Sequence, residues 1–235
     1  MKLAALFSGG KDSTYSIYKA KSEGHQIVCL ITIHPLSEES MLLHFPNTQL
    51  TKIQSESMNI PQLTIESHSN DPDSESKILE KILNEAKNKH GIEGVVHGGI
   101  SSEYQKKFFT SACTKLQLNI ISPIWQQNQK EYMQNLIESK FRFIIVSVTS
   151  SGLDDSWLGK EITQSELVNL ERLATKHGFN LNFEGGEAET LVIDCPLFAF
   201  PLKIVKAKKI WDGYRGRFEI QEAKLDHHAR KSENS

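Results

Sequence analysis

Six residues near the start of the chain combine glycine, lysine, carboxylate and hydroxyl groups in an order suited to phosphate binding. They are Ser8, Gly9, Gly10, Lys11, Asp12 and Ser13. Glycines let backbone N–H groups approach an anion, a following helix N-terminus adds partial positive charge, and Lys11 adds a full charge. Asp12 would repel a phosphate unless a cation lay between them, so it indicates a Mg²⁺ ligand or, without metal, a helix cap. The segment predicts a nucleotide site, and an ordinary glycine turn is the alternative.

A second candidate site lies about 170 residues further on, where three carboxylates surround a double glycine. These residues are Glu184, Glu187 and Glu189 around Gly185-Gly186. If the chain becomes a strand at Glu187, then Glu187 and Glu189 share one face. Paired carboxylates can hold Mg²⁺, act as a general base or bind a cation. The alternative is a solvated acidic loop, which the directly following apolar run disfavours.

The composition limits the classes of protein that the chain can represent. It has 235 residues, 27 basic and 29 acidic side chains and a net charge of −2, which argues against a large nucleic-acid surface. The mean hydropathy of −0.38, with no apolar run approaching the roughly 20 residues that span a bilayer, predicts a protein without a membrane span. The three widely spaced cysteines predict a reduced, cytoplasmic compartment and three small buried side chains: Cys29, Cys113 and Cys195.

Strand and helix signals alternate up to about residue 123. Apolar, β-branched runs predict strands over residues 2–7, 27–33, 62–66, 94–97 and 119–123. Amphipathic spacing predicts helices over residues 14–22, 48–58, 74–90 and 102–118. This alternation predicts a doubly wound parallel sheet of the Rossmann-like type, in which ligands bind at the carboxyl ends of the strands.

Several residues fall at that carboxyl edge. His34 ends the second strand, where it either contacts a nucleotide or merely ends the strand. Gly98, Gly99 and Ile100 follow the fourth strand and predict either one wall of an adenosine site or a tight turn. Tyr104 and Gln105 lie in the first turn of the next helix, near that wall.

The pattern changes after residue 123. We expect helices over residues 130–139 and 163–177, a strand over 141–148, and a β-hairpin over 203–221 that turns at 212–216. The predicted organisation is a nucleotide-binding domain over residues 1–126, a smaller C-terminal α+β domain over 127–225 that would bind the second substrate, and a polar tail over 226–235.

Four motifs together resemble those of a known enzyme family. Ser8–Ser13 resembles the PP-loop of the ATP pyrophosphatase superfamily, whose members cut ATP between the α- and β-phosphates. With the segments Gly99–Gln105, Gly152–Gly159 and Glu184–Val192, in that order, the chain resembles the diphthine–ammonia ligases from Lys2 to about Gln221. The segment Ser40–His44 also resembles a family segment, although Leu42 and Leu43 depart from its pattern.

The resemblance implies a reaction and a set of site residues. It implies ATP-dependent amidation of diphthine on translation elongation factor 2 through an acyl-adenylate, with ammonium as nitrogen donor, AMP and pyrophosphate as products, and Mg²⁺ at Asp12. The catalytic residues would be Lys11, Asp12, Glu187 and Glu189. The nucleotide would contact Ser8, Gly9, Gly10, Lys11, Asp12, Ser13, His34, Gly98, Gly99 and Ile100. The diphthine substrate would contact His44, Tyr104, Gln105, Asp154, Trp157, Glu184 and Glu187.

The trimethylammonium group of diphthine donates no conventional N–H hydrogen bond, so aromatic faces and carboxylates should bind it. Trp157 offers such a face, with a role as a core anchor of the second domain as the alternative.

Three other functions are alternatives to this one. A tRNA-modifying PP-loop enzyme would need cysteine pairs or a basic surface, and a glutamine-dependent amidotransferase would need a glutaminase domain. A non-catalytic nucleotide-binding module would explain the first loop but not the acidic segment. We expect no membrane and no direct nucleic-acid partner, and the oligomeric state is left open, with a homodimer among the alternatives.

Overall fold

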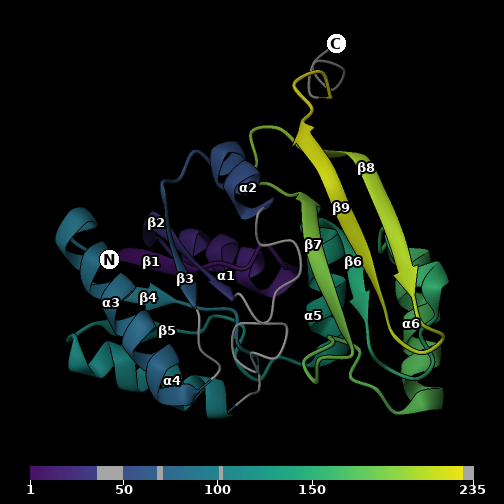
Figure 1. Cartoon of the computed structure of the whole chain (residues 1–235), viewed down its shortest axis with the longest axis horizontal. Coiled ribbons are helices and arrows are strands. Elements are labelled where there is room, and N and C mark those ends of the chain that lie inside the picture. Colours follow the sequence, from purple (N-terminus) through teal and green to yellow (C-terminus); the bar gives the residue numbers. More distant parts are fainter. Residues whose placement is uncertain (36–49, 68–70, 101–102, 230–235) are drawn as a thin grey trace. The chain divides into compact units, whose positions relative to one another are not determined.

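The computed structural model describes residues 1–35, 50–67, 71–100 and 103–229 (Figure 1). Contacts within the chain divide it into two units. Unit 1 consists of Met1–Ser8 and Asp12–Gln126, and unit 2 of Gly9–Lys11 and Gln127–Ser235. Three residues of the glycine-rich loop therefore group with the second half of the chain.

Unit 1 contains a parallel five-stranded sheet in the order β3-β2-β1-β4-β5. The strands are β1 Lys2–Leu6, β2 Gln26–Pro35, β3 Gln62–Ser67, β4 Gly94–Val96 and β5 Asn119–Ile121. The chain moves outward from β1 to β3, then crosses back to β4 on the other side of β1. This arrangement confirms the predicted doubly wound parallel sheet.

Four helices join these strands: α1 Lys11–Ser22, α2 Thr51–Met58, α3 Pro72–His90 and α4 Glu103–Lys115. Right-handed crossovers place α1 and α2 on one face of the sheet, and α3 and α4 on the other. Figure 1 shows α3 and α4 side by side, and both supply side chains to one core cluster with β1, β2 and β4.

The cysteines of the described chain behave as predicted. Cys29, Cys113 and Cys195 are free thiols, each at most 2% exposed. Burial raises the pKa of Cys29 to about 12 and that of Cys113 to about 11, so these thiols stay protonated and act as small apolar groups.

Local signals explain why several helix ends agree with prediction and why others do not. The Asp71 carboxylate accepts the Ser74 N–H at 2.9 Å to cap α3, and Gly91 ends this helix at φ 62°. Helix α4 ends three residues before the predicted Leu118, because Gln117 adopts φ 53° and turns the chain out of the helix. Helix α1 begins at Lys11, three residues before the predicted start.

Unit 2 contains an antiparallel sheet in the order β7-β6-β9-β8. Its strands are β6 Arg142–Val148, β7 Ala188–Asp194, β8 Leu202–Trp211 and β9 Gly216–Leu225, with α5 Gln129–Glu138, α6 Gln164–His177 and the 3₁₀ turn η2 Asp155–Trp157. This is the predicted α+β arrangement. No helix among the described residues has both the length and the apolar character to cross a bilayer.

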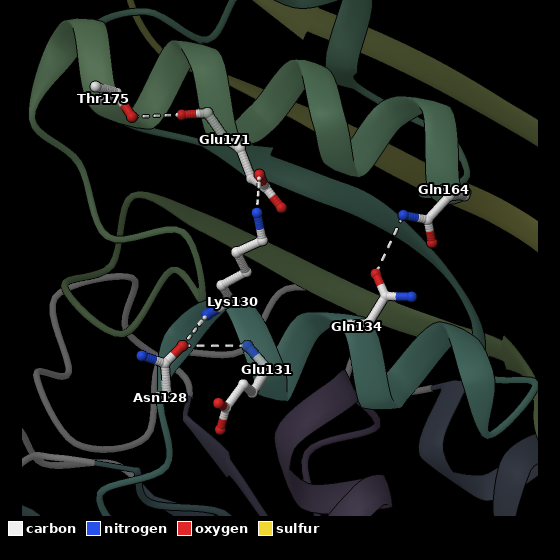
Figure 2. Close-up of polar contacts among 7 residues, drawn as sticks. All are labelled: Asn128, Lys130, Glu131, Gln134, Gln164, Glu171 and Thr175. Atoms are coloured by element: carbon white, nitrogen blue, oxygen red, sulfur yellow. Dashed lines mark hydrogen bonds and ion pairs between the residues drawn. The ribbon is translucent and has the colours of Figure 1, made fainter.

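Polar contacts join α5 to α6 in unit 2 (Figure 2). The Asn128 side-chain oxygen accepts the Lys130 N–H at 3.0 Å, which caps α5. Lys130 Nζ lies 2.9 Å from Glu171 Oε2 on α6, and Gln164 Nε2 donates to Gln134 Oε1 at 3.1 Å. These contacts are exposed, so the buried side chains between the helices should carry most of their packing energy.

We expect Leu170→Ala to lower the free energy of unfolding by about 2–5 kcal/mol, because Leu170 is fully buried and alanine leaves a cavity. Lys130→Ala serves as the control, and removing its surface ion pair should cost less than about 1 kcal/mol. Urea denaturation monitored by circular dichroism measures both. Equal losses in the two variants would contradict this ranking.

Candidate functional site

The glycine-rich loop closes on the first turn of α1. The Ser8 N–H donates to Ser13 Oγ at 3.3 Å, and the two hydroxyl oxygens lie 3.0 Å apart. Gly9 has φ 81°, a conformation that favours glycine. This closure turns the chain into a helix at Lys11 and directs the N-terminal end of α1 toward the loop.

Lys11, in the glycine-rich loop, is 1% exposed, which is unusual for a lysine. Its Nζ donates to the backbone oxygen of Asn182 at 2.6 Å. The same Nζ lies 5.7 Å from the ring centroid of Tyr132 and 5.6 Å from that of Phe183. A carbonyl and two aromatic faces of unit 2 therefore surround the ammonium group.

The backbone of the loop also bonds to β7. The Lys11 N–H donates to Thr190 Oγ1 at 3.1 Å, and the Val192 N–H donates to the Gly9 oxygen at 3.0 Å. Because β7 is an edge strand of its sheet, the loop occupies hydrogen-bonding positions that would otherwise lie on that edge.

The second glycine turn packs against the start of α1. A Cβ atom at Gly98 would lie 2.6 Å from Asp12 C and 2.6 Å from Ser13 N, so glycine is required at this position. Strands β1 and β4 are neighbours, and their carboxyl ends lie where the strand order reverses. Open α/β sheets bind ligands at this position.

His97 fixes the turn that carries Gly98 and Gly99. Its Nδ1 accepts the Gly99 N–H at 3.1 Å, so the ring proton resides on Nε2 and is donated to Ser122 Oγ. His97 is 2% exposed, and its burial, with the nearby Lys106, lowers its pKa to about 4. Gly98–Ile100 were predicted from sequence as either a nucleotide wall or a tight turn, whereas His97 was not predicted; its only signal was its place directly before two glycines.

Ile100, His34 and three residues expected near the substrates lie in separate parts of unit 1 or outside the described residues. Ile100 is 1% exposed, and its oxygen accepts the Gln126 N–H at 2.7 Å. His34 lies half-buried at the end of β2 beside Glu66 of β3; burial lowers its pKa, and Glu66 opposes that shift. The backbone of Tyr104 and Gln105 begins α4, while their side chains and His44 lie outside the described residues.

In the acidic loop, residues 183–189, the Glu187 side chain bonds to its own segment of the chain. Its Oε1 accepts the Asn180 N–H at 2.9 Å and the Asn180 Nδ2–H at 2.6 Å. Its Oε2 is buried and accepts no hydrogen bond within the described part of the chain. The Glu184 N–H donates to Asn182 Oδ1 at 3.3 Å, and Glu189 lies half-buried on β7. The structure therefore gives the three carboxylates different surroundings.

Trp157 ends the 3₁₀ turn η2, and Asp154 is the residue directly before it. The Asp154 carboxylate accepts the Ser156 N–H at 3.0 Å and caps this turn. Trp157 is 4% exposed, with Lys160 Nζ 5.0 Å from its ring centroid. In this conformation the indole packs in the core of unit 2, which corresponds to the alternative role considered for Trp157.

Comparison with known proteins finds two matching family models. The Diphthamide synthase N-terminal domain matches residues 1–120, and the Diphthamide synthase C-terminal domain matches residues 128–225. The chain is 35% identical over 216 residues to a protein of Bos taurus named diphthine–ammonia ligase, covering 84% of this chain and 80% of that protein. The Homo sapiens protein of the same name is 34% identical with the same coverage.

Among solved structures, a predicted subunit of tRNA methyltransferase from Methanocaldococcus jannaschii is similar with a TM-score of 0.45 and 15% identity. It covers 83% of this chain and 98% of that one.

We expect Gly98→Ala to weaken nucleotide binding and to lower the free energy of unfolding by about 1–3 kcal/mol, because its Cβ would push against the backbone at the start of α1. The control is Gly24→Ala, which has φ 85° and no heavy atom within 4 Å of the added Cβ. That change should cost about 1 kcal/mol of stability through backbone strain without altering ATP affinity. Calorimetric titration with ATP and urea denaturation distinguish the two. Unchanged ATP binding in Gly98→Ala would show that this turn is remote from the nucleotide.

The depressed pKa of His97 should make stability depend on pH. Between the unfolded pKa of about 6.5 and the folded value of about 4, the unfolded chain binds the additional proton, so stability falls as the pH is lowered through this window. We expect His97→Gln to lose less stability than the wild type between pH 7 and pH 4.5. Urea denaturation at several pH values measures the difference, and parallel curves would contradict it.

Proposed function

Because the chain belongs to the diphthamide synthase family, we propose that it converts diphthine on translation elongation factor 2 to diphthamide, using ATP and ammonium. The matching family models and the relatives named diphthine–ammonia ligase support this proposal. The observation that best supports ATP-dependent chemistry in this chain is the bonding of Lys11, in the phosphate-type loop, to residues on both sides of the acidic loop. The reaction would take place in the cytoplasm.

The proposed reaction has two steps that balance in atoms and charge. The diphthine carboxylate oxygen attacks the α-phosphorus of ATP, the bond to the β-phosphate oxygen breaks, and pyrophosphate leaves. Ammonia then attacks the acyl carbon, AMP departs with the bonding electron pair, and nitrogen loses a proton to leave an amide. Activation is needed because a free carboxylate is a poor electrophile.

The residues of the first loop fit the phosphate side of this reaction. We propose that phosphate lies at the N-terminus of α1 and contacts the loop at Ser8, Gly10 and Ser13, where the Ser8 N–H and hydroxyl lie beside the Ser13 hydroxyl. Mg²⁺ in nucleotide sites is held by one or two carboxylates together with substrate phosphates, and Asp12 is half-buried in the first turn of α1. When bound there, Mg²⁺ would offset the charge on the departing pyrophosphate. The described residues contain no group of three or more His, Cys, Asp or Glu side chains that could hold a metal ion.

Glu187 is the residue that best fits ammonium. Two Asn180 donors fix its Oε1, and its buried Oε2 accepts no hydrogen bond from the described residues. A buried carboxylate oxygen without a donor is costly, and an ammonium ion would supply the missing donor. We assign Glu187 to holding ammonium, and Glu189 and Glu184 to the cationic and polar parts of diphthine.

A single assay tests the proposed function. Purified protein is incubated with ATP, ammonium, Mg²⁺ and elongation factor 2 that carries diphthine. We expect AMP to form and the mass of the factor to fall by about one dalton, as an amide NH₂ replaces a hydroxyl. AMP formation that needs tRNA, with no change in the mass of the factor, would instead favour a tRNA-modifying enzyme. Nucleotide binding without AMP formation would favour a non-catalytic module.

We expect Glu187→Gln to raise the KM for ammonium by more than about tenfold while leaving ATP affinity within twofold. The glutamine oxygen can still accept from Asn180, which preserves the loop, but its NH₂ group replaces the acceptor Oε2 by a donor. Glu171→Gln, at the surface ion pair between α6 and Lys130 of α5, is the matched control. Steady-state AMP release at varied ammonium measures the change, and an altered ATP affinity would move Glu187 to the nucleotide side.

A further inference from the structure

We propose that Thr190 and Asn182 are positioning residues. Through Lys11 they couple the acidic loop to the glycine-rich loop Ser8–Ser13, here called the phosphate-type loop. The inference rests on the proposed function for the identity of the nucleotide. Residues 183–189 form the acidic loop, and one anchoring residue lies directly on each side of it. Both anchors accept a hydrogen bond from Lys11: the Asn182 backbone oxygen from the Lys11 side chain, and the Thr190 hydroxyl from the Lys11 backbone N–H.

The first anchor is the Asn182 carbonyl, which accepts from Lys11 Nζ at 2.6 Å. Asn182 is itself 2% exposed, and Phe183 adopts φ 63°, a left-handed conformation that phenylalanine rarely takes. The Phe183 ring also lies near the ammonium group, since Lys11 Nζ is 5.6 Å from its centroid. The backbone here is therefore shaped around Lys11.

The second anchor is the Thr190 hydroxyl, which accepts the Lys11 N–H at 3.1 Å. This N–H belongs to the first residue of α1 and is one of the donors that the helix cannot satisfy internally. The hydroxyl thereby caps α1 from a strand 179 residues away in the sequence. The Val192–Gly9 hydrogen bond at 3.0 Å, two residues further along β7, holds the same turn.

Burial makes this linkage stiff. An ammonium group that is 1% exposed cannot exchange its acceptors for water, so the Asn182 carbonyl and Lys11 must move together. A nucleotide that orders the Gly9–Lys11 turn should therefore also order the acidic loop. Because such coupling is reciprocal, a ligand on the acidic loop should change nucleotide affinity by the same factor.

The test uses the full chain with α,β-methylene ATP, which cannot be cut between the α- and β-phosphates. Calorimetry gives its Kd, and hydrogen exchange reports on residues 183–189. We expect Thr190→Val, which removes the hydroxyl but keeps the shape, to raise the Kd about five- to tenfold. Thr190→Ser keeps the hydroxyl and should bind within twofold of the wild type.

Hydrogen exchange distinguishes a loss of coupling between the two loops from a general loss of stability in the variant. In the wild type and in Thr190→Ser, the nucleotide analogue should slow exchange in residues 183–189, and in Thr190→Val this protection should be lost. A Thr190→Val variant that binds and transmits protection like the wild type would overturn the inference, as would a wild type in which the analogue leaves the loop unprotected. If the analogue protects residues 183–189 but the protein does not amidate diphthine on elongation factor 2, the coupling stands and the proposed protein substrate is wrong.

Lys11→Met gives a second, independent test. Methionine keeps an unbranched side chain against Tyr132 and Phe183 but loses the hydrogen bond to the Asn182 oxygen. We expect this variant to fold, with the thermal unfolding midpoint measured as a check, and to lose the protection of residues 183–189 even at saturating analogue. Protection equal to that of the wild type would show that the side chain carries no coupling.

Discussion

A lysine ammonium group cannot leave water without hydrogen-bond acceptors, and this constraint governs how the phosphate-type loop of this protein is built. Lys11 is almost completely buried, with the Asn182 carbonyl as an acceptor and two aromatic rings beside it. Leaving such a charge unpaired would cost several kcal/mol. The loop and the segment around Asn182 are therefore parts of a single arrangement, although they are far apart in the sequence.

This arrangement changes the interpretation of the lysine in the motif. From sequence, a lysine after two glycines indicates a direct phosphate ligand. In the structure the Lys11 ammonium group donates to the Asn182 carbonyl and lies near the Tyr132 and Phe183 rings. The Lys11 backbone N–H donates to Thr190 Oγ1, so this residue also helps to hold the start of α1, a role that composition and spacing do not reveal.

The sequence predicted what depends on local signals. Continuous apolar runs identified the strands of unit 1, and residues such as Gly91 marked helix ends, because capping is settled within a few residues. It misplaced the start of α1, which depends on closure of the loop by Ser13, and the end of α4, which depends on the backbone of Gln117. It also missed Asn182 and Thr190, since their contacts with Lys11 span 171 and 179 residues and follow no periodic pattern.

The three glutamates of the acidic loop show what a structure adds to a motif. Sequence spacing treats Glu187 and Glu189 alike, as two carboxylates on one face. The structure fixes one oxygen of Glu187 with two donors from Asn180, so a cation that binds its other oxygen need not order the side chain first. Glu189 instead precedes Thr190 on β7, and successive strand residues point to opposite faces. A single strand thus directs the Thr190 hydroxyl toward the glycine-rich loop, where it accepts the Lys11 N–H, and the Glu189 carboxylate toward the opposite face of the strand.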